Sequence, residues 1–295
     1  MLTTIKEILD RASAENYGVA APNVNYELDA KACIMAAEEA NAPIILDVGF
    51  KARPNDLFDF GKVVRLLAEK STVPVAICLD HGGELKQHLL AIQAGFTSLM
   101  VDRSMLPLEE NIAQVKEITR LAHAVGMSVE SELGHVGMAD NYDVDRNAAL
   151  TSPEDAVRFI EETGVDCLAV AIGTAHGAYP KGFVPYLDFE RLTEIKKATN
   201  NFPLVLHGSS GTAEEDLRKV CRMGINKINI NNDICKAIVA DIKAADLEGG
   251  KAYGIYNLII DSIKTKMIHM IDVYGSTGKA WKVEPIGVNK TLGTL

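Results

Sequence analysis

Three histidines of this chain, His81, His176 and His207, each lie at or just beyond the end of a short apolar run. Three imidazoles without a fourth protein ligand match a catalytic zinc site that keeps one position open for a substrate. Each histidine taken alone is more often a structural residue at the end of a strand. All three at equivalent positions favour a shared metal site.

An aspartate, Asp80, immediately precedes the first of these histidines. A carboxylate close to a metal-bound oxygen can exchange a proton with it, so Asp80 is a candidate catalytic residue. The alternative is an aspartate that only supports the metal ligand or caps the strand. The sequence leaves both roles open.

The stretch 203–215 offers a second kind of chemistry. An apolar run ends in His207, and Gly208-Ser209-Ser210-Gly211 follows. Thr212 and Glu215 have the spacing of a capping box, which predicts a helix capped by Thr212. Free backbone N–H groups at a glycine-rich helix start bind phosphate well. The alternative is a strand-end histidine followed by glycines that only form a tight turn.

These residues need a scaffold that brings strand ends together. Short apolar runs alternate with segments of helical periodicity, as in sheets buried on both faces. We expect an α/β fold, a (β/α)8 TIM barrel in one domain (1–295) with an extra N-terminal helix and a C-terminal helical extension. Its active site would lie at the C-terminal strand ends, with phosphate near strands seven and eight. The runs are residues 18–25, 43–49, 74–81, 97–102, 127–132, 166–173, 203–207 and 227–230.

Composition narrows the classes of function. The 295 residues are 47% hydrophobic and 24% charged, as in ordinary globular proteins, and the net charge is −10. That charge disfavours nucleic acid and anionic membranes as partners. The five cysteines are scattered without CxxC spacing, which favours a reducing cytoplasm. The N-terminus resembles no signal peptide, and no apolar run approaches the roughly 20 residues that span a bilayer.

Five motifs, in this order, resemble the class II, zinc-dependent ketose-bisphosphate aldolases, which include the fructose- and tagatose-bisphosphate aldolases. The resemblance extends from about residue 21 to 233, and the motifs are specific as an ordered set. They are Leu79-Asp80-His81-Gly82, Glu130-Ser131-Glu132-Leu133-Gly134, Gly173-Thr174-Ala175-His176-Gly177, Val205-Leu206-His207-Gly208-Ser209-Ser210-Gly211 and Lys227-Ile228-Asn229-Ile230.

The resemblance implies an aldolase, a lyase that interconverts a ketose (bis)phosphate with dihydroxyacetone phosphate and an aldehyde such as glyceraldehyde 3-phosphate. It implies that His81, His176 and His207 bind Zn²⁺, with an additional monovalent cation as a second ion to test for. It implies that Asp80 gives a proton to the aldehyde carbonyl oxygen. It also implies a small phosphorylated sugar as partner and a homodimer or homotetramer. The substrate-binding residues it implies are Gly177, Lys181, Gly208, Ser209, Ser210, Asn229, Ile230, Asn231 and Asn232.

Three segments depart from the family's pattern. Asp102-Arg103-Ser104 and the segment 49–53 differ where the aldehyde would lie, so the aldehyde stays open. Arg103 either turns inward to an anionic aldehyde or pairs on the surface with Glu109 or Glu110. The polar segment 137–150 predicts a loop in which Asp140 or Asp143 is a candidate base for enolising the ketose.

Three alternative functions stay open. The first is a class II aldolase that acts on a different phosphorylated ketose. The second is a metal-dependent hydrolase, which would draw a His-x-His pair from the first strand, where Asn23-Val24-Asn25 stands. The third is an inactive sugar-phosphate-binding protein, which would have lost a metal ligand or Asp80. A Schiff-base mechanism would need Lys227, whose place inside a strand indicates a structural role.

Overall fold

The computed structural model describes residues 1–49, 57–136, 150–175 and 185–283. Eight parallel strands form one sheet in the order β1-β8-β7-β6-β5-β4-β3-β2. A bridge between Asn23 and Asp47 brings the first and second strands together, so the sheet nearly closes into a barrel. The strands are β1 (Val19–Pro22), β2 (Ile44–Gly49), β3 (Val75–Gly82), β4 (Ser98–Val101), β5 (Ser128–Leu133), β6 (Cys167–Val170), β7 (Leu204–Leu206) and β8 (Ile225–Ile230).

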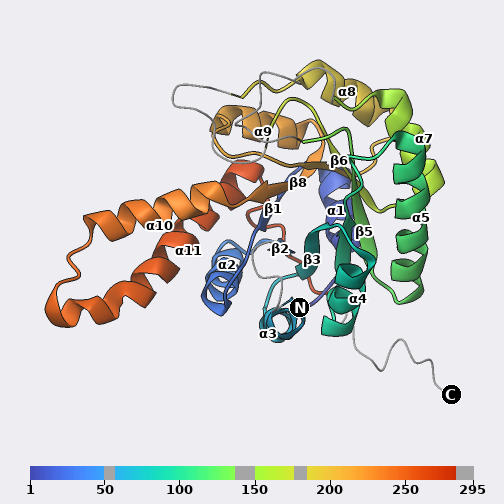
Figure 1. Cartoon of the computed structure of the whole chain (residues 1–295). Helices are drawn as coiled ribbons and strands as arrows, with labels where there is room; N and C mark the ends of the chain where they lie inside the picture. Colours follow the sequence, from blue (N-terminus) through green and yellow to red (C-terminus); the bar gives the residue numbers. More distant parts are fainter. Residues whose placement is uncertain (50–56, 137–149, 176–184, 284–295) are drawn as a thin grey trace.

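Helices alternate with these strands and surround the sheet, which confirms the predicted TIM barrel (Figure 1). A short 3-10 helix, η2 (Gly249–Gly254), joins the last two α-helices. The α-helices are α1 (Ile5–Glu15), α2 (Glu27–Glu39), α3 (Leu57–Lys70), α4 (Leu85–Ala94), α5 (Leu108–Ala124), α7 (Pro153–Thr163), α8 (Phe189–Ala198), α9 (Glu214–Arg222), α10 (Asn232–Ala244) and α11 (Ile255–Tyr274).

The barrel interior is filled in layers because side chains alternate between the two faces of each strand. The N-terminal end of the barrel is closed by α1, whose Ile5, Ile8 and Leu9 pack with inward apolar residues such as Ile45 and Met100. Further along the strands the inward positions become polar. The buried polar groups there include Asp47, Glu130, Lys227, Asp80, Glu132, His207 and Asn229.

The last two α-helices form an arm. Figure 1 shows α10 and α11, in orange and red, extending as a hairpin away from the barrel. The buried residues of α11 all lie from Ser262 onward, and α11 packs against α2, α9 and β1. Ile234 is the single buried residue of α10, and Val239, Tyr253 and Tyr256 on the arm are exposed. The arm therefore presents apolar side chains that the barrel does not cover.

Two predictions about the chain as a whole can be compared with the structure. All five cysteines are free thiols, as their scattered spacing indicated. Among the helices in the described ranges, none combines the length and apolar character that crossing a membrane requires.

Candidate functional site

Two of the three predicted histidine ligands face each other at the C-terminal end of the barrel. His81 is in β3, and His207 directly follows β7. Nε2 of His81 lies 3.2 Å from Nδ1 of His207. Two nitrogens bound to one tetrahedral Zn²⁺, with bonds of roughly 2.0–2.1 Å, would lie about 3.3 Å apart. The pair therefore fits a shared metal ion.

The backbone explains how both Asp80 and His81 reach the site. Neighbouring residues of a regular strand point to opposite faces, so an inward Asp80 would turn His81 outward. His81 instead has a left-handed φ of 50°, and the pairing of β3 with β4 shifts register between Leu79 and Gly82. Such a conformation is uncommon for a residue other than glycine and is found at functional sites. This irregularity places two consecutive polar side chains at the mouth of the barrel, the end at which the C-terminal ends of the strands lie.

A carboxylate holds the far nitrogen of each histidine. Nδ1 of His81 lies 2.7 Å from Asp102 Oδ2, and Nε2 of His207 lies 2.9 Å from Glu130 Oε1. A carboxylate that accepts the outer N–H fixes the ring and leaves the inner nitrogen for a metal. Although burial alone opposes it, the charges of Asp80 and Asp102 raise the pKa of His81 to about 9. A metal ion bound between the rings would have to displace the proton that this raised pKa favours.

Further oxygen donors surround the histidine pair. Asp80 Oδ1 lies 4.0 Å from Nε2 of His81, and Asp80, His81 and His207 form one potential ligand group. A second group combines His81, Asp102 and Glu132. Oε2 of Glu132 is buried without a hydrogen-bond partner among the described residues. Burial and the charge of Asp102 raise the pKa of Glu132 to about 8. The donor set suits a divalent metal.

The Asp80 carboxylate is held by two amides. Asn23, beyond β1, donates from Nδ2 to Oδ2 at 2.7 Å, and Asn229 of β8 donates from Nδ2 to Oδ1 at 3.3 Å. Burial alone would raise the pKa of Asp80, but the charges of His81 and Lys227 hold it below its usual value. Asp80 is therefore a carboxylate near neutral pH. Only 8% of it is exposed, at the mouth.

Lys227 lies beneath these groups in the barrel interior. Its side chain is fully buried and forms ion pairs with Asp47 and Glu130. Burial lowers its pKa, yet the two carboxylates outweigh burial and keep the pKa well above the usual value. A permanently protonated amine is not a nucleophile. The structural role that the sequence indicated for Lys227 agrees with this arrangement.

The turn after β7 has the geometry of an anion cradle. Gly208 has a φ of +67°, and a Cβ there would lie 2.3 Å from the carbonyl oxygen of Ala175. The Ser209 hydroxyl donates to the Asn229 carbonyl at 2.6 Å, which ties the turn to β8. The backbone N–H groups of Ser209 and Ser210 have no acceptor among the described residues. Such groups can bind a phosphate oxygen.

The end of β8 provides a second cradle beside the first. Ile230 ends the strand and is buried, whereas Asn231 is exposed. Asn232 begins α10, so the positive end of that helix lies at the mouth. Nδ2 of Asn232 is buried and lacks a hydrogen-bond partner among the described residues. Donors without partners among the described residues thus lie at both strand ends where the sequence predicted phosphate.

The predicted cap of the helix after this turn is wrong. α9 begins at Glu214 with Ala213 as its N-cap residue, and no side chain caps it. Thr212 instead belongs to the turn, because its N–H donates to the Ser209 carbonyl. Its hydroxyl is buried without a partner among the described residues. Thr212 and Glu215 do have capping-box spacing, but the turn holds Thr212 one residue before the N-cap position, which Ala213 occupies.

Arg103 adopts neither of the two orientations considered from the sequence. Its Nε donates to Gln114 at 2.6 Å, and its Nη1 donates to the carbonyls of Asp102 at 2.8 Å and Gly82 at 3.3 Å. Glu109, a candidate partner, pairs with Arg158 instead. Arg103 therefore braces the backbone on either side of the contact between His81 and Asp102.

Several predicted residues cannot be placed. The third histidine, His176, and the substrate-binding candidates Gly177 and Lys181 lie outside the described residues, as do the loop aspartates 140 and 143 and the segment 50–53. The chain is described up to Ala175, which lies against Gly208. Thr174 donates its hydroxyl to the His207 carbonyl at 2.6 Å. The segment before His176 therefore reaches the same mouth.

Sequence reasoning did not assign roles to Glu130 and Asn23. Glu130 lies in a quoted motif, and its contact with His207 gives it a role in orienting that ring. A signal was available, because Ser128, Glu130 and Glu132 place polar groups at alternate positions of a buried strand. Alternation indicates that they face the barrel interior, but it does not indicate which histidine each would meet.

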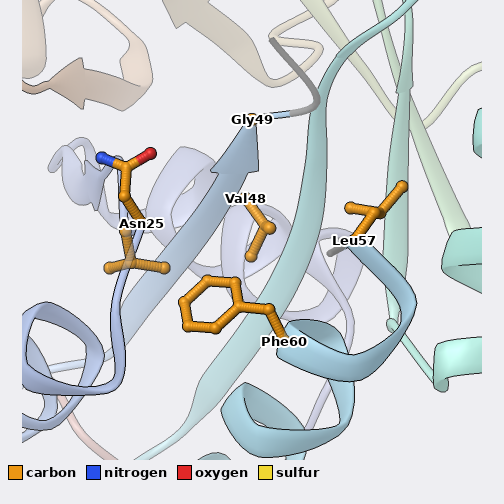
Figure 2. A pocket seen from close by; sticks show the side chains of 6 residues that line it. Asn25, Val48, Gly49, Leu57 and Phe60 are labelled. Atoms are coloured by element: carbon orange, nitrogen blue, oxygen red, sulfur yellow. The ribbon is translucent and has the colours of Figure 1, made fainter. Parts of the chain in front are cut away.

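A small pocket lies beside the mouth. It contains about 180 Å³ of space, partly open to solvent, between the ends of β1 and β2 and helix α3. Figure 2 shows Val48 and Phe60 side by side within it, with Asn25 opposite. Val48 alternates with Asp47, so it points away from the barrel interior. The pocket is thus an apolar gap between sheet and helix, separate from the histidine pair.

Comparison with known proteins agrees with this geometry. The family described as fructose-bisphosphate aldolase class-II matches residues 3–279. The fructose-bisphosphate aldolase of Thermus caldophilus is 37% identical over 306 residues, covering 95% of this chain and 100% of that protein. The crystal structure of the YdjI aldolase from Escherichia coli K12 is 34% identical, with a TM-score of 0.83 over 95% of this chain and 100% of that one. A putative fructose-1,6-bisphosphate aldolase from Coccidioides immitis is 27% identical, with a TM-score of 0.84 over 94% of this chain and 98% of that one. A barrel with paired histidines beside a buried aspartate, in a sequence matched over nearly its whole length, places this chain in the class II fructose-bisphosphate aldolase family, and the protein is an aldolase.

Proposed function

We propose that this aldolase uses Zn²⁺ to cleave a ketose bisphosphate into dihydroxyacetone phosphate and an aldehyde such as glyceraldehyde 3-phosphate, and to catalyse the reverse condensation. The observation that carries the proposal is the 3.2 Å contact between His81 and His207 beside the Asp80 carboxylate. His176 completes the proposed ligand set. Three imidazoles with an open fourth position favour zinc.

When bound, the metal would act as a Lewis acid that polarises the carbonyl of the ketose. The residues of the chain provide the rest. Asp102 and Glu130 hold the two histidine rings so that one nitrogen of each faces the metal position. The Asn23 and Asn229 amides hold the Asp80 carboxylate next to it.

Asp80 is the proposed proton-transfer group. In the cleavage direction, its carboxylate takes the proton from the substrate hydroxyl that becomes the aldehyde carbonyl, as the carbon–carbon bond breaks. The electron pair of that bond moves onto the donor half, which must then gain a proton at carbon to leave as dihydroxyacetone phosphate. In condensation, Asp80 returns that proton to the aldehyde oxygen as the new bond forms. The lowered pKa of Asp80 suits the first of these steps, because the group must begin as a carboxylate.

The phosphate of the donor half is proposed to bind the two cradles. Gly208, Ser209 and Ser210 provide one, and Asn229 to Asn232 provide the other, with backbone N–H groups as the main donors. Gly177 and Lys181 complete this proposal. Phosphate held in this way would position the reacting carbon close to Asp80.

The nature of the ketose is best tested directly. Some relatives are named as fructose-bisphosphate aldolases, whereas YdjI is named as an aldolase without a stated substrate. A panel of ketose mono- and bisphosphates, coupled to reduction of dihydroxyacetone phosphate, should show one that is cleaved fastest by zinc-loaded protein. Release of dihydroxyacetone phosphate from no member of the panel would refute the proposal. Fast cleavage of a different ketose phosphate would replace fructose 1,6-bisphosphate as the substrate.

We further propose a homo-oligomer in which the arm contacts a second copy. Val239, Tyr253 and Tyr256 are exposed there. The segment 232–266 has five acidic and five basic side chains, so its formal charge is zero on a chain of net charge −10. Two neutral arms can approach each other without the electrostatic repulsion that acts between the negatively charged remainders of the two molecules. Sedimentation should show a dimer or tetramer that Tyr256→Asp weakens, and a monomeric parent protein would contradict the proposal.

A further inference from the structure

A single buried ammonium forms the floor of the site. Lys227 of β8 is fully buried, and its Nζ lies 2.7 Å from Oδ1 of Asn229. The same nitrogen lies 3.0 Å from Asp47 Oδ2 and 3.0 Å from Glu130 Oε2. An ammonium has three N–H donors. Nζ donates hydrogen bonds to Asn229 Oδ1 and, at 3.3 Å, to Glu130 Oε1, and it lies within ion-pair distance of Asp47. These partners belong to three strands, β8, β5 and β2.

The contact of Lys227 with Asn229 fixes the orientation of the Asn229 amide. Because Lys227 donates to the oxygen of the Asn229 amide, the NH₂ group of that amide points the other way. There it donates to Asp80 Oδ1 at 3.3 Å. Without the ammonium, the amide could rotate and set its oxygen against the Asp80 carboxylate, which would repel it. Lys227 thus determines that Asn229 presents a donor to Asp80.

The contact of Lys227 with Glu130 fixes the orientation of the Glu130 carboxylate. Both oxygens of Glu130 face the ammonium, Oε2 at 3.0 Å and Oε1 at 3.3 Å, and Oε1 also accepts the N–H of His207 at 2.9 Å. The ring of His207 is therefore oriented by a carboxylate that is itself oriented by Lys227. Buried polar groups in such a series are strongly coupled because the interior screens them weakly.

We propose that Lys227 is a positioning residue that holds Asp80 and His207 in a fixed relation to each other, acting through Asn229 and Glu130. It touches neither the reacting atoms nor the metal position. Two branches lead from Lys227: the Asp80 branch passes through Asn229, and the His207 branch passes through Glu130. The Asp80 branch rests on the proposed function, whereas the His207 branch concerns only metal binding. Asp47 takes no part in either branch; it lies 3.0 Å from the ammonium.

The test compares two folded variants. Lys227→Met alone would leave the buried Asp47 and Glu130 without the ammonium that they both face, so it is combined with Asp47→Asn. Asp47→Asn by itself is the matched control, because it keeps Lys227 in contact with Asn229 and Glu130. Relative to this control, the double variant should lower kcat for ketose bisphosphate cleavage at least about 100-fold, with KM changed less than about threefold. Its Zn²⁺ dissociation constant, from competition with a chelator, should rise about 10–100-fold.

The two branches are separated with Asn229→Leu. In the control background this variant should lower kcat without changing Zn²⁺ affinity, since the Glu130 branch is intact. Adding Lys227→Met to it should then lower kcat by less than about a further threefold, because the branch is already broken, yet should still weaken Zn²⁺ binding. The effects of the two substitutions on kcat would then not add, whereas Lys227→Met would weaken Zn²⁺ binding whether or not Asn229 is replaced. A general loss of stability is not expected to give this pattern.

Two results would overturn the proposal. One is a cooperatively folded double variant whose kcat and Zn²⁺ affinity equal those of the Asp47→Asn control. The other, which applies even if the double variant does not fold, is Asn229→Leu with an unchanged kcat. If the parent protein cleaves no ketose phosphate, the proposed function fails, but the Zn²⁺ comparison still tests the His207 branch.

Discussion

Replacing Asp80 by asparagine tests the proposed proton transfer with little change of shape. The two carboxylate oxygens accept from Asn23 at 2.7 Å and from Asn229 at 3.3 Å. The Asn229 amide cannot rotate, because Lys227 holds its oxygen at 2.7 Å. The new amide must therefore turn its oxygen toward Asn229 and its NH₂ toward Asn23, whose own amide can rotate to accept.

The structure limits the cost to the fold. Two hydrogen bonds to a charged acceptor become neutral ones, a loss of roughly 1 kcal/mol each. Removing a buried charge offsets part of that loss. The free energy of unfolding should therefore fall by at most about 2 kcal/mol. Losing the proton-transfer group should lower kcat by about 10²–10⁴, which corresponds to roughly 2.7–5.5 kcal/mol in the barrier.

The assay follows two reactions of the same protein. Cleavage is measured through coupled reduction of dihydroxyacetone phosphate, and proton exchange is measured at the reacting carbon of dihydroxyacetone phosphate. Asp80→Asn should abolish most of the first and spare most of the second, because exchange needs no proton at the aldehyde oxygen. Asp80→Ala is the comparison that also removes both amide contacts. Equal losses in the two reactions, together with weaker Zn²⁺ binding, would show that Asp80 only supports the metal.

Three further predictions follow from the same geometry. His207→Ala should lower the metal content below one Zn²⁺ per chain and abolish cleavage, with an unchanged circular dichroism spectrum. Treating the parent protein with a chelator should also abolish cleavage, and added Zn²⁺ should restore it. Full activity after either change would contradict the metal site. Gly208→Ala should lower the melting temperature and raise KM for dihydroxyacetone phosphate in condensation, because its Cβ would lie 2.3 Å from the Ala175 oxygen at a φ of +67° and the left-handed conformation alone costs about 1–2 kcal/mol; a parental KM would count against this cradle. Arg103→Ala should reduce the free energy of unfolding by about 1–2 kcal/mol through loss of its bonds to Gln114 and two carbonyls, while KM for the aldehyde stays within about threefold; a tenfold higher KM with unchanged stability would return Arg103 to a substrate-facing role.

Much of the fold could be predicted from the sequence because barrel strands are buried on both faces. Apolar runs such as 74–81 and 203–207 stand out against the amphipathic helices between them, so all eight strands were found. The location of the mouth follows from the chain direction, since parallel strands end on the same side. On that basis His81, His176 and His207 are predicted to share one site, and the structure places the first and the last of them 3.2 Å apart.

Local patterns were less reliable where the tertiary structure competes with them. Thr212 has the spacing of a helix cap, yet the turn that ties Ser209 to Asn229 holds it before the helix. The sequence allows Arg103 to face either a substrate or a surface carboxylate, but in the structure it donates to Gln114 and to backbone carbonyls. Neither outcome could be predicted from spacing, because each depends on groups far away in the chain or on backbone oxygens that every residue has.

The sequence by itself determined the element order, the barrel and the kinds of group at its mouth, because these depend on periodicity and on residue type. Only the tertiary structure decided which groups work together. The left-handed backbone at His81 turns two adjacent side chains toward one site. The contacts of Lys227 with Asn229 and Glu130 join residues up to 97 positions apart. Such pairings arise from strand register and from the need to satisfy every buried charge, and a list of residue types does not contain either.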